Sequence, residues 1–354
     1  MALSTVWFCL IALLWMGYFV LEGFDFGVGM LLPFLARDER ERRVLINTIG
    51  PVWDGNEVWV LTAGGATFAA FPEWYATLFS GFYLPLLLIL LALIVRGVAF
   101  EFRHQRPERS WQRWWDRAII VGSFVPALLW GVAFANLVRG VPIDASKNFT
   151  GTIWTLLNPI GILGGLMTLT IFLAHGAMFV ALKTDGEIRH RARRWAVVLG
   201  LVAAVVAVVF LVWTEVHTGD LASGILFVAA AVCLVGGVAA AALGREGWAF
   251  LGTFLTLLLA VAGLFVALFP DVMPSTTPGG VTLTTTNASA THYTLTVMTI
   301  IAAIFTPFVI AYQAWSYWIF RKRIGVHHIP TEELEQRGGR GDIGMDPDPG
   351  DVTA

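Results

Sequence analysis

Charged residues and cysteines are both scarce in this sequence. Only 14% of its 354 residues are charged, whereas a soluble globular domain carries about 25%. The net charge of −2 provides no basic surface for a nucleic acid. The two cysteines, Cys9 and Cys233, each stand in an apolar run and form no CxxC, haem-attachment or zinc pattern. We interpret them as small packing residues.

Motifs of soluble enzymes are absent as well, because the sequence contains no P-loop, HExxH or GxSxG pattern. Of the seven histidines, only His175 lies well inside an apolar run. One buried histidine without a second axial ligand at a similar depth does not make a b-type haem site. We therefore expect His175 to form a hydrogen bond to a neighbouring helix. We expect no metal site and no catalytic residue in this chain.

Long apolar runs are abundant, and hydrophobic residues make up 57% of the chain. A membrane-spanning helix needs about 20 apolar residues. Suitable runs cover residues 5–33, 49–71, 77–97, 118–138, 157–181, 195–214, 221–243, 248–269 and 293–319. The first run lacks a basic leader and a small-residue cleavage site, so it reads as a membrane helix rather than a signal peptide. The sequence predicts an all-α integral membrane protein with nine transmembrane helices.

The positions of the basic residues predict the orientation of these helices. All of the 23 lysines and arginines except Arg139 and Lys147 fall on one side of the nine expected spans, and none is assigned to the interior of a span. Because cytoplasmic loops carry the basic excess, the N-terminus is expected outside and the C-terminus in the cytoplasm. The expected units are a first four-helix bundle, a second four-helix bundle with an outer loop, a ninth helix and a disordered cytoplasmic tail. They cover residues 1–143, 144–292, 293–320 and 321–354.

Four acidic residues lie within the expected spans. Glu22 and Asp25 belong to the first helix, and Asp54 and Glu57 begin the second. Each pair has i,i+3 spacing, which places both carboxylates on one helix face. A carboxylate in the membrane costs roughly 2.5–3.5 kcal/mol on insertion scales. Such groups can hold and pass protons near neutral pH, or they can serve as buried hydrogen-bonding partners that fasten the first helix to the second.

The segment that holds these acids, LEGFDFGVGMLLPFLARDERERRVLINTIGPVWDGNEVWVLTAGGATFAAFP (21–72), resembles subunit II of cytochrome bd-type quinol oxidases. The stretch GPVWDGNEVW is its most specific part. Further similarity lies at residues 80–83, 121–142, 156–165, 269–275 and 295–299. The resemblance implies two four-helix bundles and a peripheral helix, paired with a similar subunit I by pseudo-twofold symmetry.

The same resemblance implies a role in an aerobic respiratory chain of the bacterial cytoplasmic membrane. Subunit I would hold two b-type haems, one d-type haem and the quinol-oxidation loop. The complex would oxidise quinol, reduce dioxygen to water and take up protons from the cytoplasm, with no activity in this chain alone. The resemblance leaves open small accessory subunits and a quinone bound structurally within this subunit.

The resemblance also assigns roles to individual residues. Asp54 looks like an aspartate that feeds protons from the cytoplasmic side towards the haems, and Asp25 matches an aspartate of the same motif. Glu22 stands where an aspartate is also found. Trp59 is similar to a tryptophan at the entrance of a dioxygen channel, and the alternative is an ordinary lipid-facing aromatic residue. Arg96 is expected either to pair with an acid or with a haem propionate of subunit I, or to serve as a positive-inside anchor.

One residue departs from the family pattern. Glu57 stands where some relatives carry glutamine, and this adds a carboxylate beside Asp54.

Two alternatives to an oxidase subunit remain. Membrane acids and a faint internal repeat also suit a proton-coupled secondary transporter, and acids that only brace helices would suit a structural scaffold.

Overall fold

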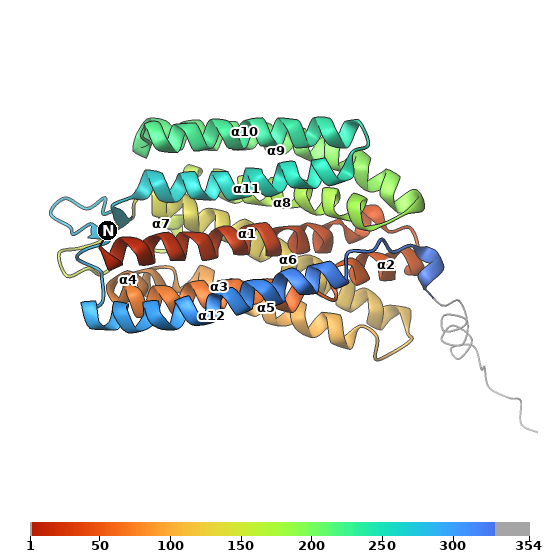
Figure 1. Cartoon of the computed structure of the whole chain (residues 1–354), viewed down its shortest axis with the longest axis horizontal. Helices are drawn as coiled ribbons and strands as arrows, with labels where there is room; N and C mark the ends of the chain where they lie inside the picture. The colour runs from red at the N-terminus through yellow and green to blue at the C-terminus, as the bar shows by residue number, and fades with distance from the viewer. Residues whose placement is uncertain (1, 330–354) are drawn as a thin grey trace, which may run out of the picture.

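The computed structural model describes residues 2–329, and its helices run side by side along the long axis of the molecule (Figure 1). The long helices are α1 (Leu3–Leu35), α3 (Trp53–Ala70), α5 (Tyr83–Phe102), α6 (Arg109–Arg139), α8 (Pro159–Lys183), α9 (Gly186–Thr218), α10 (Leu221–Ala242), α11 (Glu246–Leu268) and α12 (His292–Ile319). The shorter elements are α2 (Glu39–Ile49), α4 (Pro72–Gly81), α7 (Ile153–Leu156), the 3-10 turn η1 (Val326–His328) and the antiparallel strands β1 (Asp271–Met273) and β2 (Leu283–Thr284).

Within residues 2–329, eight helices are long and apolar enough to cross a membrane, namely α1, α5, α6 and α8 to α12. This confirms an all-α, multi-pass membrane architecture. Helix α3 is not among the eight, and its first turns carry Asp54, Asn56 and Glu57. Each expected apolar run overlaps a long helix, but the ninth crossing and the orientation in the membrane stay predictions.

Three features differ from the expected pattern of helices. An amphipathic helix, α2, follows α1 and begins at the N-cap Asp38, whose side chain accepts a hydrogen bond of 2.8 Å from the backbone N–H of Glu41. The run expected at 77–97 is divided at Phe82 between α4 and α5. Helix α9 extends beyond the apolar run at both ends, because polar residues at helix termini reach past the hydrocarbon region.

Helix α1 lies at the centre and packs against α3, α6, α8 and α11. Its closest approach to α8 is at Gly27 and Gly176, where a Cβ atom on Gly176 would lie 2.6 Å from the Cα of Gly27. Small residues allow this backbone contact, which is the usual basis of tight packing between membrane helices. The central helix therefore holds the first set of helices (α3, α5 and α6) and the second (α8 to α11) together.

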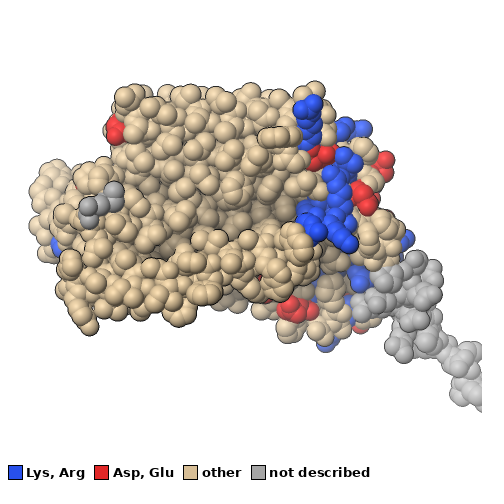
Figure 2. Space-filling model, in the orientation of Figure 1, with Lys and Arg blue, Asp and Glu red and all other residues tan. Residues whose placement is uncertain are grey.

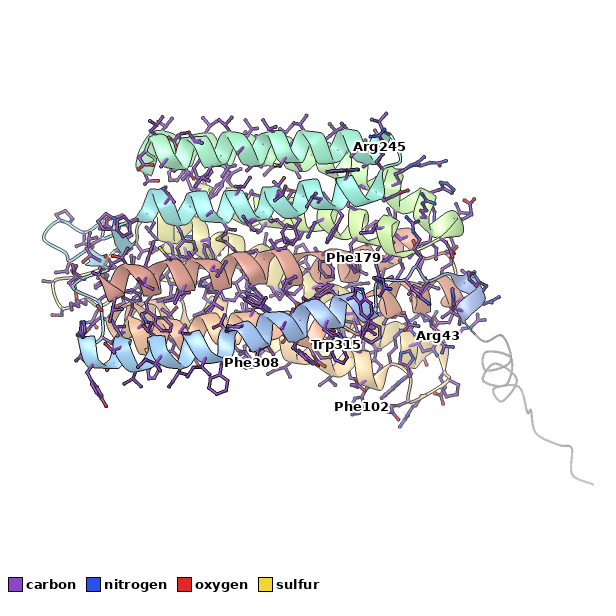
Figure 3. The ribbon with its side chains drawn as sticks, in the orientation of Figure 1. Arg43, Phe102, Phe179, Arg245, Phe308 and Trp315 are labelled. Atoms are coloured by element: carbon purple, nitrogen blue, oxygen red, sulfur yellow. The ribbon has the colours of Figure 1, made fainter. Side chains whose placement is uncertain are left out.

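Charged residues gather at one end of the molecule and leave a broad uncharged belt (Figure 2). Arg43 and Arg245 lie towards this end (Figure 3). The largest ion-pair network here centres on Arg103, which is 2.7 Å from Asp116 and 2.8 Å from Glu39. It ties α2, α5 and α6 together at the end where the basic residues were expected.

The segment after α12 crosses this charged end. The ammonium group of Lys183 donates hydrogen bonds to the carbonyls of Phe320 and Lys322. The backbone N–H of Ile324 donates to Lys183 O at 2.9 Å, and Arg40 donates to Val326 O at 3.0 Å. These contacts fasten the C-terminal end of α12 to α2 and α8. The tail expected at residues 321–354 lies outside the described residues from residue 330 onwards.

Candidate functional site

The four acids form a gradient of exposure. Asp54 lies exposed in the first turn of α3, with Glu101 of α5 as a charged neighbour. One turn further along α3, the side chain of Glu57 is 22% exposed. Glu22 and Asp25 on α1 are 0% exposed. The acids therefore reach from the surface near the charged end into the centre of the bundle.

Arg96 connects the acids of α1 and α3. Its Nη1 forms an ion pair with Glu22 Oε1 and lies 3.8 Å from Glu57 Oε2. Its guanidinium group also faces the ring of Phe26 at 4.9 Å, a favourable cation–π arrangement. Gly122 of α6 makes room for it, because a Cβ atom there would lie 2.7 Å from the Cβ of Arg96.

The expectation that no lysine or arginine lies inside a span is wrong for Arg96. This residue is fully buried within α5 and does not belong to the loop that follows. Buried membrane charges are tolerated when they pair with one another. Glu22 and Glu57 of this chain supply that pairing here, and the pairing of Arg96 with an acid or a haem propionate of subunit I stays a prediction.

Asn56 joins the acids to α12. Its side-chain amide is fully buried and donates to Asp25 Oδ2 at 2.6 Å. Its carbonyl oxygen accepts a hydrogen bond of 3.1 Å from Gln313 and one of 2.7 Å from Tyr317. The sequence reasoning missed these two residues of α12. The feature of the sequence that could have indicated them is the pair of polar side chains, one helical turn apart, in a mainly apolar run.

Several polar atoms of the cluster have no hydrogen-bond partner among residues 2–329. They are Glu22 Oε2, Asp25 Oδ1, Glu57 Oε2, Arg96 Nε and Arg96 Nη2. Buried polar side-chain atoms in proteins are usually paired, and exceptions call for an explanation such as a functional role. The unpaired oxygens of Glu22 and Asp25 lie on neighbouring turns of α1, and that of Glu57 lies 3.8 Å from Arg96 Nη1.

Trp59 lies on α3 and is partly buried. Its ring packs against Gly17 of α1, where any Cβ atom would clash with it. The adjacent Val60 lines an apolar cavity between α1, α3, α4, α6 and α11, together with Trp15, Trp74 and Phe134. The role of Trp59 at the entrance of a dioxygen channel stays a prediction.

His175 forms the expected hydrogen bonds to neighbouring helices. Its Nε2 lies 3.1 Å from Val20 O, and its Nδ1 lies 2.7 Å from Thr253 Oγ1. Because a carbonyl can only accept, Nε2 carries a proton. In a neutral ring Nδ1 is then an acceptor for the hydroxyl of Thr253, which also lies 3.1 Å from Phe250 O. Both ring nitrogens are therefore engaged, and the ring stacks on Phe250. Within residues 2–329, no group of three or more His, Cys, Asp or Glu side chains could hold a metal ion.

The family model for cytochrome bd terminal oxidase subunit II matches residues 3–320. The chain belongs to this family. It is 45% identical to the cytochrome bd ubiquinol oxidase subunit 2 of Bacillus subtilis, over 91% of this chain and 97% of that protein. It is 37% identical to the cytochrome bd-I ubiquinol oxidase subunit 2 of Escherichia coli K12, over 94% and 97%.

The fold of this subunit II family member is shared with a solved oxidase. A chain of the bd oxidase structure from Geobacillus thermodenitrificans matches with a TM-score of 0.74 and 17% sequence identity. The match covers 90% of this chain and 97% of that chain. At this identity the likeness supports the fold alone.

Proposed function

We propose that this chain acts as subunit II of a bd-type quinol oxidase and conducts protons from the cytoplasm towards the site of dioxygen reduction. Its relatives from Bacillus subtilis and Escherichia coli are named as subunits of ubiquinol oxidases and align over nearly their whole length. The complex oxidises quinol and reduces dioxygen to water. The transporter alternative is not favoured.

The gradient of exposure in the acids is the observation that carries the proton path. Asp54 is reachable from the charged end, and Glu57 follows one turn later on the same face of α3. Arg96 brings Glu57 next to Glu22, and Asp25 lies one turn from Glu22 on α1. A proton would enter at Asp54, move to Glu57 and reach the fully buried pair on α1.

Arg96 has a distinct task in this path. A fully buried carboxylate is stable only when a charge or a hydrogen bond compensates it. Arg96 compensates Glu22 and Glu57 together, so one of the two can be ionised while the other carries a proton. Two carboxyl groups beside one cation can therefore transfer one proton at a time from Glu57 to Glu22.

We also propose the arrangement of the complex around this chain. The N-terminus lies outside and the charged end faces the cytoplasm, where the gathering of Lys and Arg in Figure 2 fits the positive-inside rule. Helix α3 would be the ninth crossing, because a partner subunit and the pairing with Arg96 would offset its polar first turns. The haems would belong to subunit I, since both ring nitrogens of His175 are engaged.

The test replaces Asp54 with Asn in the purified complex and measures quinol-dependent oxygen uptake per haem. A proton-path residue is expected to lose about tenfold or more of the rate, with haem content and assembly retained. Glu187→Gln is the matched control, because this exposed acid lies at the same end on α9, away from the cluster. Its oxygen uptake should be unchanged.

A scaffold role predicts a different result. If Asp54→Asn keeps full oxygen uptake, or if the loss is explained entirely by missing haem, Asp54 does not conduct protons. Glu57→Gln extends the test along the path, since this variant keeps the shape of the side chain and removes its ability to carry a proton, together with its charge beside Arg96. An unchanged rate in both variants would refute the proposed route.

A further inference from the structure

We propose that Tyr317 and Gln313 of the peripheral helix α12 are positioning residues for Asp25, acting through the amide of Asn56. This inference rests on the proposed proton path and adds α12 to it. It gives a specific task to a helix that otherwise has little contact with the bundle.

Helix α12 is nearly unburied. Leu295 is its only buried residue among those described, and Phe308 and Trp315 are 70% and 56% exposed (Figure 3). At its outer end, Trp7 Nε1 donates to Thr299 Oγ1 at 3.0 Å and to Leu295 O at 3.3 Å. At its inner part, Gln313 and Tyr317 contact Asn56. The two attachments are on different turns and can be removed separately.

The inner attachment uses the whole hydrogen-bonding capacity of Asn56. A primary amide offers two donor hydrogens and a carbonyl with two lone pairs. The donors go to Asp25 Oδ2 at 2.6 Å and to Leu21 O at 3.4 Å. The carbonyl accepts from Gln313 Nε2 at 3.1 Å and from the Tyr317 hydroxyl at 2.7 Å.

This saturation fixes which end of the amide faces Asp25. The carbonyl oxygen of Asn56 points to α12 because two donors meet it there. If both donors were lost, the side-chain amide of Asn56 could rotate by 180° and exchange its nitrogen and oxygen. Its oxygen would then face the carboxylate of Asp25. The two residues of α12 therefore keep a donor on Asp25 Oδ2 and leave Oδ1 as its proton-accepting oxygen.

The other titratable groups around Asp25 come from several helices. They are Glu22 on α1, Glu57 on α3, Arg96 on α5 and Tyr317 on α12. Among the described residues, the donors to Asn56 Oδ1 are Gln313 and Tyr317 of α12.

The experiment uses the purified complex and its reduced-minus-oxidised infrared difference spectrum. The band in the carboxyl C=O stretching region that disappears in Asp25→Asn is the band of Asp25. We expect Tyr317→Phe and Gln313→Leu, singly and together, to shift this band, because its frequency reports the hydrogen bonds of the carboxyl group. Oxygen uptake should fall about threefold for each lost bond, the effect of an average hydrogen bond between membrane helices.

Two controls separate positioning from simple fastening. Tyr312→Phe removes the same hydroxyl from an exposed residue of α12. Thr299→Val removes one of the two hydrogen bonds of the outer attachment, the bond from Trp7 to Thr299 Oγ1, and leaves Asn56 untouched. Both should leave the Asp25 band in place. If Tyr317→Phe prevents assembly, Gln313→Leu carries the test alone with the same expected shift.

The outcomes distinguish the two proposals. If Asp25→Asn abolishes a band and slows oxygen uptake, but the α12 variants leave the band unmoved or Thr299→Val moves it equally, the positioning role is wrong and the proton path stands. If Asp25→Asn neither removes a band nor slows uptake, the path through Asp25 fails, and the positioning role fails with it.

Discussion

Replacing Arg96 with Met should strongly destabilise the protein. Arg96 and Glu22 are both fully buried, and they form an ion pair. Removing one partner of a buried pair leaves an uncompensated charge and typically costs about 3–5 kcal/mol. We expect a loss of this size in the free energy of unfolding, since Glu22 would keep no cationic partner among the described residues.

The pair of Arg96 with Glu57 makes a second contribution to the expected loss in free energy of unfolding. At 3.8 Å and an effective dielectric constant of about 20, a pair of unit charges interacts by about 4 kcal/mol. The Glu57 side chain is 22% exposed, so solvent screening reduces its share well below that figure. The Glu22 pair therefore dominates, and Glu22→Gln combined with Arg96→Met should recover at least half of the loss.

The assay is unfolding of the purified complex in mixed micelles of increasing SDS content, followed by circular dichroism. Arg113→Met is the matched control, because it removes an exposed arginine from the interior of α6 and should change stability by less than about 0.5 kcal/mol. The reasoning is refuted if Arg96→Met is as stable as the wild type. It is also refuted if the double variant is no more stable than the single one.

Three further changes test the packing around the site. Gly176→Leu should prevent assembly by separating α1 from α8, as judged by size-exclusion chromatography, whereas Gly236→Ala, which has open space around it, should assemble normally. His175→Leu should lower the free energy of unfolding by about 1–3 kcal/mol and leave the haem spectrum of the complex unchanged; a lost haem band would contradict the hydrogen-bonding role. Lys183→Met should speed proteolysis after α12, because its ammonium group binds two carbonyls of that segment, and an unchanged cleavage rate would argue against this fastening.

The membrane helices could be predicted from the sequence because hydropathy is a local property. Each of the nine apolar runs overlaps a long helix, although α2 and α4 were not expected and the run at 77–97 is divided at Phe82. Arg96 shows where local reasoning fails. An arginine near the end of an apolar run looks like a loop residue. The cost of burying the charge of Arg96 is offset only by its acidic partners from α1 and α3.

The site was predictable only in part for the same reason. The i,i+3 spacing placed Glu22 beside Asp25 and Asp54 beside Glu57, and these pairs lie where the spacing put them. The contacts of Asn56 with Gln313 and Tyr317 join residues 257 and 261 positions apart, which no periodicity can reveal. A polar side chain inside an apolar run indicates that a partner exists and does not say which one.

The hydrogen bonds within the bundle differ between residues that only hold helices together and residues proposed to carry protons. A residue that only braces two helices should have its polar atoms paired, because an unpaired buried group is costly. Asn56 and His175 meet that expectation, with all of their side-chain polar atoms engaged. Glu22 and Asp25 do not, since each keeps one buried oxygen without a hydrogen-bond partner among the described residues. Glu22 and Asp25 also join α1 to α5 and α3, through Arg96 and Asn56, and the remaining oxygen of each carboxyl group is the one on which the proposed proton path depends.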